Sequence, residues 1–237
     1  MNRVESKKLI HNGGSKFLAN VREIVFGVED GIVSTLGALI GIAIATGDQF
    51  TVVVSGVVII AVESISMGIG SYLSTRSVRE IDEQMIHEER VEVQELLEDE
   101  IEELRELYYK EGWPKDLANK MALTASKDED LMLREMSYRE LRIFPEKGSE
   151  NITAGIVMFF SYILGGFIPL SGYLFFAIPS GIMFSIAFAA SGLFVLGCVI
   201  SKFSKVIWWK VGARILILGG ISTLVGSIIG QIAEMIR

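Results

Sequence analysis

Hydrophobic residues in this chain gather in long runs, and polar residues gather between them. Each of five runs is about twenty residues long, which is enough to cross the roughly 30 Å hydrocarbon core of a bilayer. These runs cover residues 28–46, 52–75, 152–176, 178–200 and 210–232. Half of the 237 residues are apolar, so pattern and composition together predict an all-α integral membrane protein with five transmembrane helices.

The polar segments divide the chain into four parts. Residues 1–20 form a polar N-terminal arm, which is either an interfacial helix that ends near Leu18 or a disordered tail. Residues 21–77 hold the first two spans, 78–150 a polar insert, and 151–237 the last three spans. Apolar positions at helical spacing predict about three helices in the insert. The first continues from the second span, because no proline or strong breaker interrupts Tyr72 to Glu106.

Charged residues are separated along the chain. Of the 22 Lys and Arg residues, five lie at residues 1–22, twelve between Arg76 and Lys147, and four between Lys202 and Arg214. Five spans would place these three basic regions on one side of the membrane, which the positive-inside rule identifies as cytoplasmic. The insert also holds 22 of the 29 acidic residues. We therefore expect a cytoplasmic, acidic insert and no nucleic-acid partner.

Three carboxylates lie within or at the start of the apolar runs. Glu29 and Asp30 open the first span, and Glu63 lies in the second, four residues before Met67. A carboxylate in a membrane span costs roughly 2.5–3.5 kcal/mol on insertion scales, so it marks a functional site by default. Carboxylate oxygens suit hard divalent cations, and a methionine sulfur favours transition metals. We expect a path for a metal cation or for protons; the alternative for Glu63 is a neutral carboxyl hydrogen-bonded between helices.

Four glutamates of the insert share one helix face. At 100° per residue they fall within an arc of about 80°; they are Glu89, Glu92, Glu100 and Glu103. On a straight helix Glu89 and Glu100 would be about 16 Å apart, too far to hold one ion unless the helix bends or breaks. The pattern fits metal binding by each i,i+3 pair, and it also fits a solvated acidic face. His87, next to them, is more typical of a surface residue than of a ligand.

Several motifs together resemble those of the vacuolar iron transporter family. The first span carries Phe26-Gly27-Val28-Glu29-Asp30-Gly31, and the second carries Ser66-Met67-Gly68-Ile69-Gly70-Ser71-Tyr72. The insert continues the likeness with Glu100-Ile101-Glu102-Glu103-Leu104, and the last span with Val211-Gly212-Ala213-Arg214. The resemblance covers nearly the whole chain from Arg22 onward.

This resemblance implies a homodimer of five-helix subunits that exchanges Fe²⁺, and often Mn²⁺, for protons and moves the metal out of the cytoplasm. Asp30 and Met67 match the family's pathway ligands. The cytoplasmic metal ligands of the family match Glu89, Glu92, Glu100 and Glu103. On the third insert helix, the family's Met pair and following glutamate match Met136, Ser137 and Glu140, so one of the two methionines is kept.

The chain also departs from the family pattern. Glu29 replaces an Asn before the first-span Asp, and Ser71 replaces a Glu four residues after the Met. Glu63 stands instead four residues before Met67, where a small residue is usual. The Asn-Pro that breaks the helix between the two glutamate pairs in many members is absent here. These changes affect the expected ion preference and the geometry of the insert.

Two hypotheses follow. In the first, the protein is no enzyme but a proton-coupled antiporter that exports Fe²⁺ or Mn²⁺ through Asp30, Glu63 and Met67, with Glu29 near the mouth. In the second, it is a membrane-anchored metal store or sensor that does not transport. We expect no permanently bound cofactor; the partners are divalent ions, protons, lipid and a second copy of the chain. The expected location is the cell membrane of a prokaryote, with a eukaryotic vacuolar membrane as the alternative.

Overall fold

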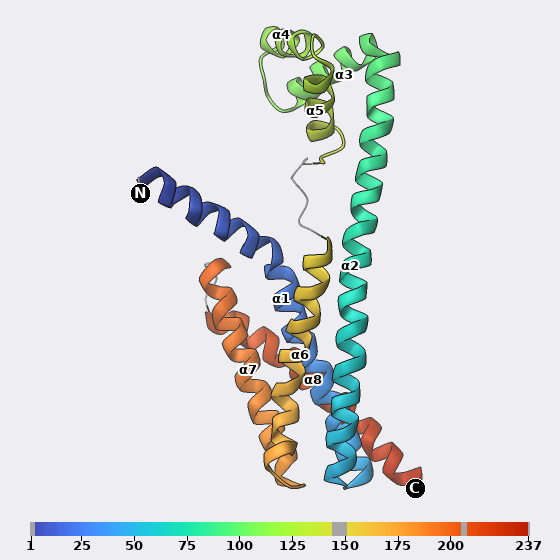
Figure 1. Ribbon diagram of the computed structural model, residues 1–237, viewed down its shortest axis with the longest axis vertical. Coiled ribbons are helices and arrows are strands. Elements are labelled where there is room, and N and C mark those ends of the chain that lie inside the picture. Colours follow the sequence, from blue (N-terminus) through green and yellow to red (C-terminus); the bar gives the residue numbers. More distant parts are fainter. Residues whose placement is uncertain (1–2, 144–150, 205–207, 237) are drawn as a thin grey trace. The chain divides into compact units, whose positions relative to one another are not determined.

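The structure, a computed structural model, describes residues 3–143, 151–204 and 208–236, and its secondary structure is helical. These residues form eight α-helices and no strand (Figure 1). The helices are α1 (Arg3–Thr46), α2 (Gln49–Glu95), α3 (Leu97–Lys110), α4 (Lys115–Ala125), α5 (Glu129–Arg139), α6 (Asn151–Phe175), α7 (Ser180–Ser204) and α8 (Trp208–Ile236).

The helices divide between two compact units. The membrane unit comprises Met1–Leu73 and Ser149–Arg237, and the acidic unit comprises Ser74–Gly148. Helix α2 contributes its first half to the membrane unit and its second half to the acidic unit. Each unit has hydrophobic clusters of its own.

Four of the five predicted spans coincide with helices that are long and apolar enough to cross a membrane. They are Asn20–Thr46, an apolar stretch within Gln49–Glu95, Ile152–Phe175 and Ser180–Ser201. The fifth predicted span falls on α8. The structure does not describe the side chains of many α8 residues, and the apolar helix among the described ones covers only Thr223–Ile232. The fifth span and the cytoplasmic side of the insert therefore stay predictions.

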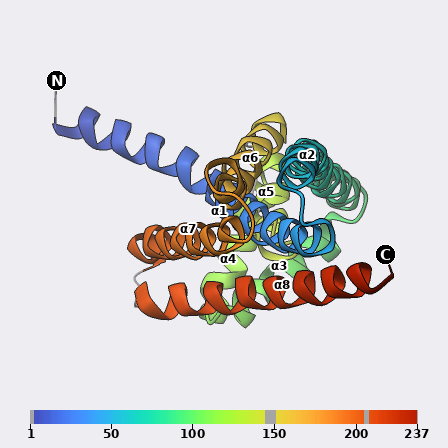
Figure 2. The same ribbon diagram turned by 90° about the horizontal axis from the view of Figure 1, so that it is seen from below.

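Helix α1 lies in the middle of the membrane unit and contacts α6, α7 and α8 (Figure 2). One hydrophobic cluster joins Ile32 and Leu36 of α1 to Leu193 of α7. A second joins Leu39 of α1 to Val52 of α2 and Leu170 of α6. These apolar contacts determine which face of α1 turns toward each neighbouring helix.

Glycines allow the backbones of α1 and its neighbours to approach closely. A Cβ atom built on Gly31 would lie 2.5 Å from the carbonyl oxygen of Tyr162 on α6. Where α1 contacts α8, Gly37 and Gly41 of α1 face Gly226 and Gly230 of α8, backbone against backbone. Small residues at this spacing let membrane helices pack closely.

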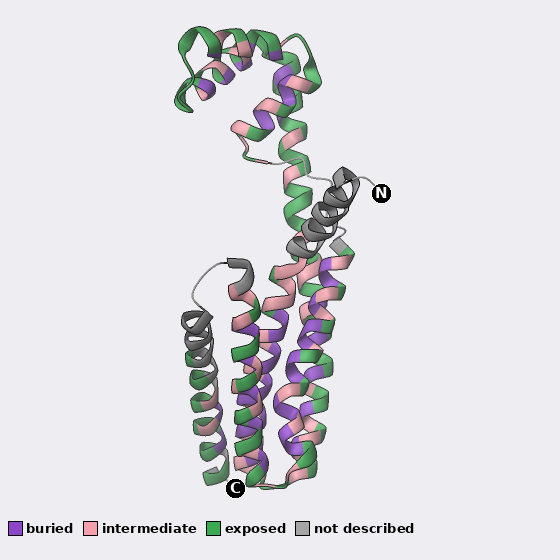
Figure 3. Ribbon diagram, turned by 90° about the vertical axis from the view of Figure 1, so that its left-hand side faces the viewer, coloured by how far each residue is buried: buried purple, intermediate pink, exposed green. Residues whose placement is uncertain are grey.

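The helices of the membrane unit expose many residues on their outer faces (Figure 3), and a large share of these are large apolar side chains. On α2 the exposed large side chains recur every three or four residues; they are Val54, Val58, Val62, Ile65, Ile69 and Leu73. Helix α6 repeats the pattern with Ile156, Phe160, Leu164 and Phe167. Contiguous apolar surface of this extent is covered by lipid or by another protein in a stable molecule. It agrees with the membrane-spanning role of these helices.

Two expectations about helix ends are wrong. Helix α1 begins at Arg3 and runs without interruption into the first span, so the arm is neither a disordered tail nor a helix that ends near Leu18. The helix of the second span does not continue to Glu106. It ends at Glu95, and α3 begins at Leu97 after Leu96, whose φ of −125° and ψ of 36° are not helical.

Local signals account for the other connections. Gly47 has a φ of 64° and ends α1, and the Asp48 carboxylate accepts a 2.8 Å bond from the Thr51 amide at the start of α2. Gly112, with a φ of 100°, follows α3, and Pro114 directly precedes α4. Asp128 caps α5 through the Leu131 amide at 3.1 Å. These signals separate the three short helices of the acidic unit.

The close contact of α1 and α6 leads to the first prediction. Gly31→Ala places a methyl group against the α6 backbone, and overpacking of this kind costs about 1–3 kcal/mol. We expect the midpoint of thermal unfolding, measured on detergent-solubilised protein, to fall by several degrees.

Gly70→Ala is the matched control, because a Cβ at that helical position meets no atom within 4 Å. The control should be neutral or slightly stabilising, since Ala favours a helix over Gly by about 1 kcal/mol. Equal midpoints in the two variants would contradict the close packing.

Candidate metal centre

The break at Leu96 brings together glutamates that a straight helix would hold far apart. Glu89 lies on α2, Glu100 lies on α3, and Glu140 follows the last residue of α5. Carboxylate oxygens of these three residues all lie within 4.8 Å of one another. All three belong to the acidic unit. The structure therefore assembles a three-carboxylate cluster from three helices.

Two of these carboxylates are withdrawn from water. Glu89 is 3% exposed and Glu100 is 5% exposed, whereas Glu140 is exposed. Oε1 of Glu89 and Oε2 of Glu100 are buried and accept no hydrogen bond from any residue that the structure describes. A buried charge is costly unless a counter-charge or metal compensates it. The two oxygens have the chemistry of ligands for a hard cation.

Burial and mutual repulsion raise the pKa values of the cluster. Burial raises the pKa of Glu89 to about 8, and the charges of Glu140, Glu100 and Glu92 add to this rise. Burial also raises the pKa of Glu100 and of Glu140, with the Glu103 charge as the next cause in both. Glu89 lies close enough to Glu140 and Glu100 to share a proton with them. Without a cation, the cluster therefore retains a proton near neutral pH.

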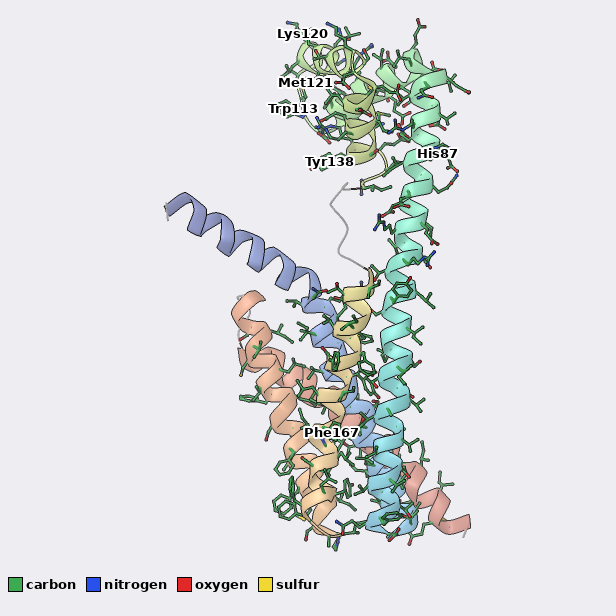
Figure 4. All side chains as sticks on the ribbon, in the orientation of Figure 1. His87, Trp113, Lys120, Met121, Tyr138 and Phe167 are labelled. Atoms are coloured by element: carbon green, nitrogen blue, oxygen red, sulfur yellow. The ribbon has the colours of Figure 1, made fainter. Side chains whose placement is uncertain are left out.

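The other insert residues singled out in the sequence take different places. Glu92 and Glu103 have exposed side chains whose charges act on the buried cluster. Met136 is fully buried in the hydrophobic core of the unit, in one cluster with Val93 and Leu104. His87 is exposed on α2 (Figure 4). A ligand role for Glu92, Glu103 or Met136 stays a prediction.

An apolar layer supports the three glutamates. Val93 lies one turn from Glu89, Leu104 one turn from Glu100, and Met136 one turn from Glu140. All three apolar residues are buried in the same cluster. Because residues four apart lie on the same helix face, packing of this layer turns the glutamates toward one another. The core of the unit thereby sets the geometry of the carboxylates.

The membrane unit contains a second group of acidic residues. Asp30 of α1 and Glu63 of α2 lie close enough for their charges to interact, and both also act on Tyr162 of α6. Asp30 is half-buried and Glu63 is exposed on the single chain. Glu29, half-buried beside Asp30, interacts with it as well. The role of these carboxylates in transport stays a prediction.

Hydroxyl groups connect Asp30 to α6. The Ser34 hydroxyl donates to the Asp30 carbonyl oxygen at 2.7 Å and lies 2.7 Å from the hydroxyl of Tyr162, which is fully buried. Since the one Ser34 hydrogen is used, the Tyr162 hydroxyl is the donor to Ser34. Sequence reasoning missed Tyr162, although a tyrosine in the middle of an apolar span was a usable signal. Met67, half-buried one turn beyond Glu63, stays a predicted ligand.

Comparison with known proteins identifies the family of this chain. The family model described as the VIT family matches residues 21–231, which include both acidic groups. The chain belongs to the VIT family. This assignment confirms the family resemblance drawn from the motifs.

Relatives of this VIT-family chain are named as iron transporters. Vacuolar iron transporter 1 of Tulipa gesneriana is 25% identical over 185 residues, which are 78% of this chain and 75% of the relative. Vacuolar iron transporter 1 of Arabidopsis thaliana is 26% identical over 194 residues, 80% of this chain and 77% of the relative. The vacuolar iron transporter of Plasmodium falciparum is 26% identical over 196 residues, covering 78% and 72%.

The raised pKa of Glu89 predicts how pH affects the metal-free VIT-family protein. The folded state holds this proton up to a pH of about 8, whereas the unfolded chain releases it near the ordinary pKa of 4.5. The folded state therefore binds more protons in this window, and its stability falls as the pH rises from about 5 to 8. Hydrogen exchange of the α3 and α5 amides, corrected for the intrinsic effect of pH, measures this change.

Glu89→Gln should remove most of this pH dependence. Glu88→Gln is the control, because Glu88 is exposed on α2 and accepts a 2.8 Å hydrogen bond from Gln84. The control should behave like the wild type. Protection that rises with pH in the wild type would contradict the buried cluster.

Proposed function

We propose that this protein is a proton-coupled transporter of divalent metal ions that exports Fe²⁺ or Mn²⁺ from the cytoplasm. The observation that carries the proposal is the group of Glu89, Glu100 and Glu140, in which each of the two buried carboxylates has one oxygen that accepts no bond from described residues. Relatives named vacuolar iron transporter support a metal ion as the substrate. The protein acts on an ion and is not an enzyme.

In this mechanism the acidic unit collects the ion. Glu89, Glu100 and Glu140 bind it, and the exposed Glu92 and Glu103 attract it by their charge. Binding requires the cluster to release its proton, because metal and proton compete for the same oxygens. The thioether of Met136 is the softer ligand that would favour a transition metal over Ca²⁺ or Mg²⁺.

The span carboxylates then pass the ion across the membrane. Asp30 and Glu63 repel each other when both are ionised, and a divalent cation or a proton relieves this repulsion. Either species can occupy the same place, which is the physical basis of exchange. Met67 adds a sulfur ligand one turn from Glu63, and Glu29 lies near the entrance. Tyr162 and Ser34 orient the backbone around Asp30 through their hydrogen bonds.

The protein works as a homodimer with its basic segments and acidic unit in the cytoplasm. The distribution of Lys and Arg supports this orientation through the positive-inside rule. The exposed apolar face of α2 around Val58, Val62 and Ile65 supports contact with a second copy, which would also cover the exposed Glu63. We propose the cell membrane of a prokaryote as the location, with a vacuolar membrane as the alternative.

One observation favours a second function, a membrane-anchored metal store or sensor. The three-carboxylate cluster lies entirely within the acidic unit, which has its own hydrophobic core. Such a unit needs no transport path to bind an ion. The span carboxylates Asp30 and Glu63 favour transport instead, because a store has no use for charges that cost free energy in a membrane.

Transport predicts that the span carboxylates are required for flux. Asp30→Asn and Glu63→Gln should each reduce Fe²⁺ and Mn²⁺ uptake into proteoliposomes with an imposed pH gradient by about tenfold or more. Each substitution removes one negative charge, so the charge of the divalent ion is no longer fully balanced within the membrane. Glu80→Gln is the control, since its carboxylate forms an exposed ion pair with Arg76 at 2.7 Å. Wild-type flux in both span variants would count against the transport path.

Metal binding by the acidic unit is tested separately on the full chain in detergent. Glu89→Gln and Glu100→Gln should weaken Mn²⁺ binding by about tenfold or more, since each removes a buried ligand. Titration calorimetry with Fe²⁺, Mn²⁺, Co²⁺, Zn²⁺ and Ca²⁺ gives the ion preference. Tight binding without any flux would favour the store, and binding unaffected by these substitutions would contradict the proposed centre.

A further inference from the structure

Arg139 is the last residue of α5 and directly precedes Glu140, the exposed member of the cluster. Its side chain is only 14% exposed. Nε donates to Oε2 of Glu135 at 3.1 Å, and Nη1 donates to Oε2 of Glu111. Glu135 lies one turn back on α5, whereas Glu111 follows the last residue of α3. The guanidinium group therefore ties the ends of two helices together.

Tyr108 of α3 completes this network. It is 2% exposed, and its hydroxyl donates to Oε2 of Glu135 at 3.0 Å. The Arg139 guanidinium lies over the Tyr108 ring, 4.4 Å from its centroid, and 5.6 Å from that of Tyr138. Burial raises the pKa of Tyr108 to about 12, so the hydroxyl keeps its hydrogen at any physiological pH. Each contact fixes α5 against α3.

Glu140 depends on this network for its position. Its amide donates to the Met136 carbonyl oxygen at 2.8 Å, which makes Glu140 an extension of the last turn of α5. Directly after it the chain leaves the helix, with Arg142 at a φ of 56° and the Ile143 amide bonded back to Ser137 at 2.9 Å. The last turn of α5 therefore determines where the Glu140 carboxylate lies.

We infer that Arg139 is a positioning residue for the metal centre: by clamping the end of α5 to α3, it holds the Glu140 carboxylate against Glu89 and Glu100. The inference rests on the proposed function of this cluster as a metal site. Helix α3 carries both Glu100 and the Tyr108 that anchors the clamp, so one helix links the clamp to a ligand. Disturbing the clamp moves Glu140 relative to Glu100.

The charge balance of the clamp suits a cation site. Arg139 brings one positive charge, and Glu111 and Glu135 bring two negative charges, so the group as a whole does not repel a divalent cation. Arginine also suits the task better than lysine, because its planar guanidinium makes two directed bonds at once while stacking on an aromatic ring. Arg139→Lys keeps the charge and loses this geometry.

A double-mutant cycle tests the inference on the full-length protein in detergent, with Mn²⁺ affinity measured by titration calorimetry. Arg139→Gln and Glu140→Gln should each weaken Mn²⁺ binding, by about tenfold, the range found when groups that orient metal ligands are removed. The double variant should bind no more weakly than Glu140→Gln alone, because without that carboxylate there is nothing left to position. Losses that multiply in the double variant would overturn the inference.

Milder variants guard against simple unfolding. Tyr108→Phe removes one hydrogen bond and keeps the ring, and Arg139→Lys keeps the charge; both should bind Mn²⁺ with affinities between wild type and Arg139→Gln. Lys110→Gln is the matched control, because Lys110 pairs with Glu106 at 3.6 Å with both side chains exposed. It should bind like the wild type. Wild-type affinity in both milder variants would also overturn the inference.

The outcomes separate this inference from the proposed function. A wild-type protein that binds no Mn²⁺, or binds it equally well with Glu89→Gln, would overturn the metal centre and the positioning role together. Normal wild-type binding that requires Glu89, combined with independent losses for Arg139 and Glu140, would overturn only the positioning role.

Discussion

Repulsion between carboxylates removed from water is the interaction on which the described sites of this protein depend. In water two such groups interact weakly, but at lower dielectric the same separation costs several-fold more free energy. The chain creates this situation in the acidic unit, with Glu89 and Glu100, and in the membrane unit the half-buried Asp30 interacts with Glu63, which is exposed on the single chain. In both places a proton or a cation is the species that relieves the repulsion.

Such groups stay together only because other contacts hold them there. In the acidic unit, a buried apolar layer one turn from the glutamates supplies the attractive free energy. In the membrane unit, glycine contacts such as Gly31 against Tyr162 let α1 and α6 pack backbone to backbone. Apolar packing thus stabilises the two units and at the same time maintains an arrangement of charges that is unfavourable without an ion.

Much of the architecture could be predicted from the sequence. Long apolar runs identify the spans, because lipid requires an apolar surface about twenty residues long. Helix ends are indicated by residues that favour them, namely Gly112, Pro114 and the capping residue Asp128. The glutamates of the insert are recognisable by their helical spacing. All of these signals are local, and each acts through the residue that carries it.

The break at Leu96 could not be predicted in this way. Leucine favours helices, and the sequence around it contains no proline or glycine. The break follows from tertiary packing, because it allows Val93 of α2 and Leu104 of α3 to enter one hydrophobic core. The contacts of Tyr162 with α1 and of Arg139 with α3 could not be predicted from local sequence signals either, since they join residues far apart in the chain. Sequence spacing therefore identifies candidate ligands, whereas packing decides which of them meet.

The single non-helical residue at Leu96 has a consequence for ion size. Glu100 lies four residues beyond it, so its Cα is roughly 6 Å from the pivot along a helix that rises 1.5 Å per residue. Over that lever arm, a rotation of about 4° displaces the Cα by roughly 0.4 Å, comparable to the difference between Mg²⁺–oxygen and Ca²⁺–oxygen distances. If the three carboxylates bind an ion as proposed, the stiffness of one pair of backbone dihedral angles becomes a determinant of which ionic radius they accept.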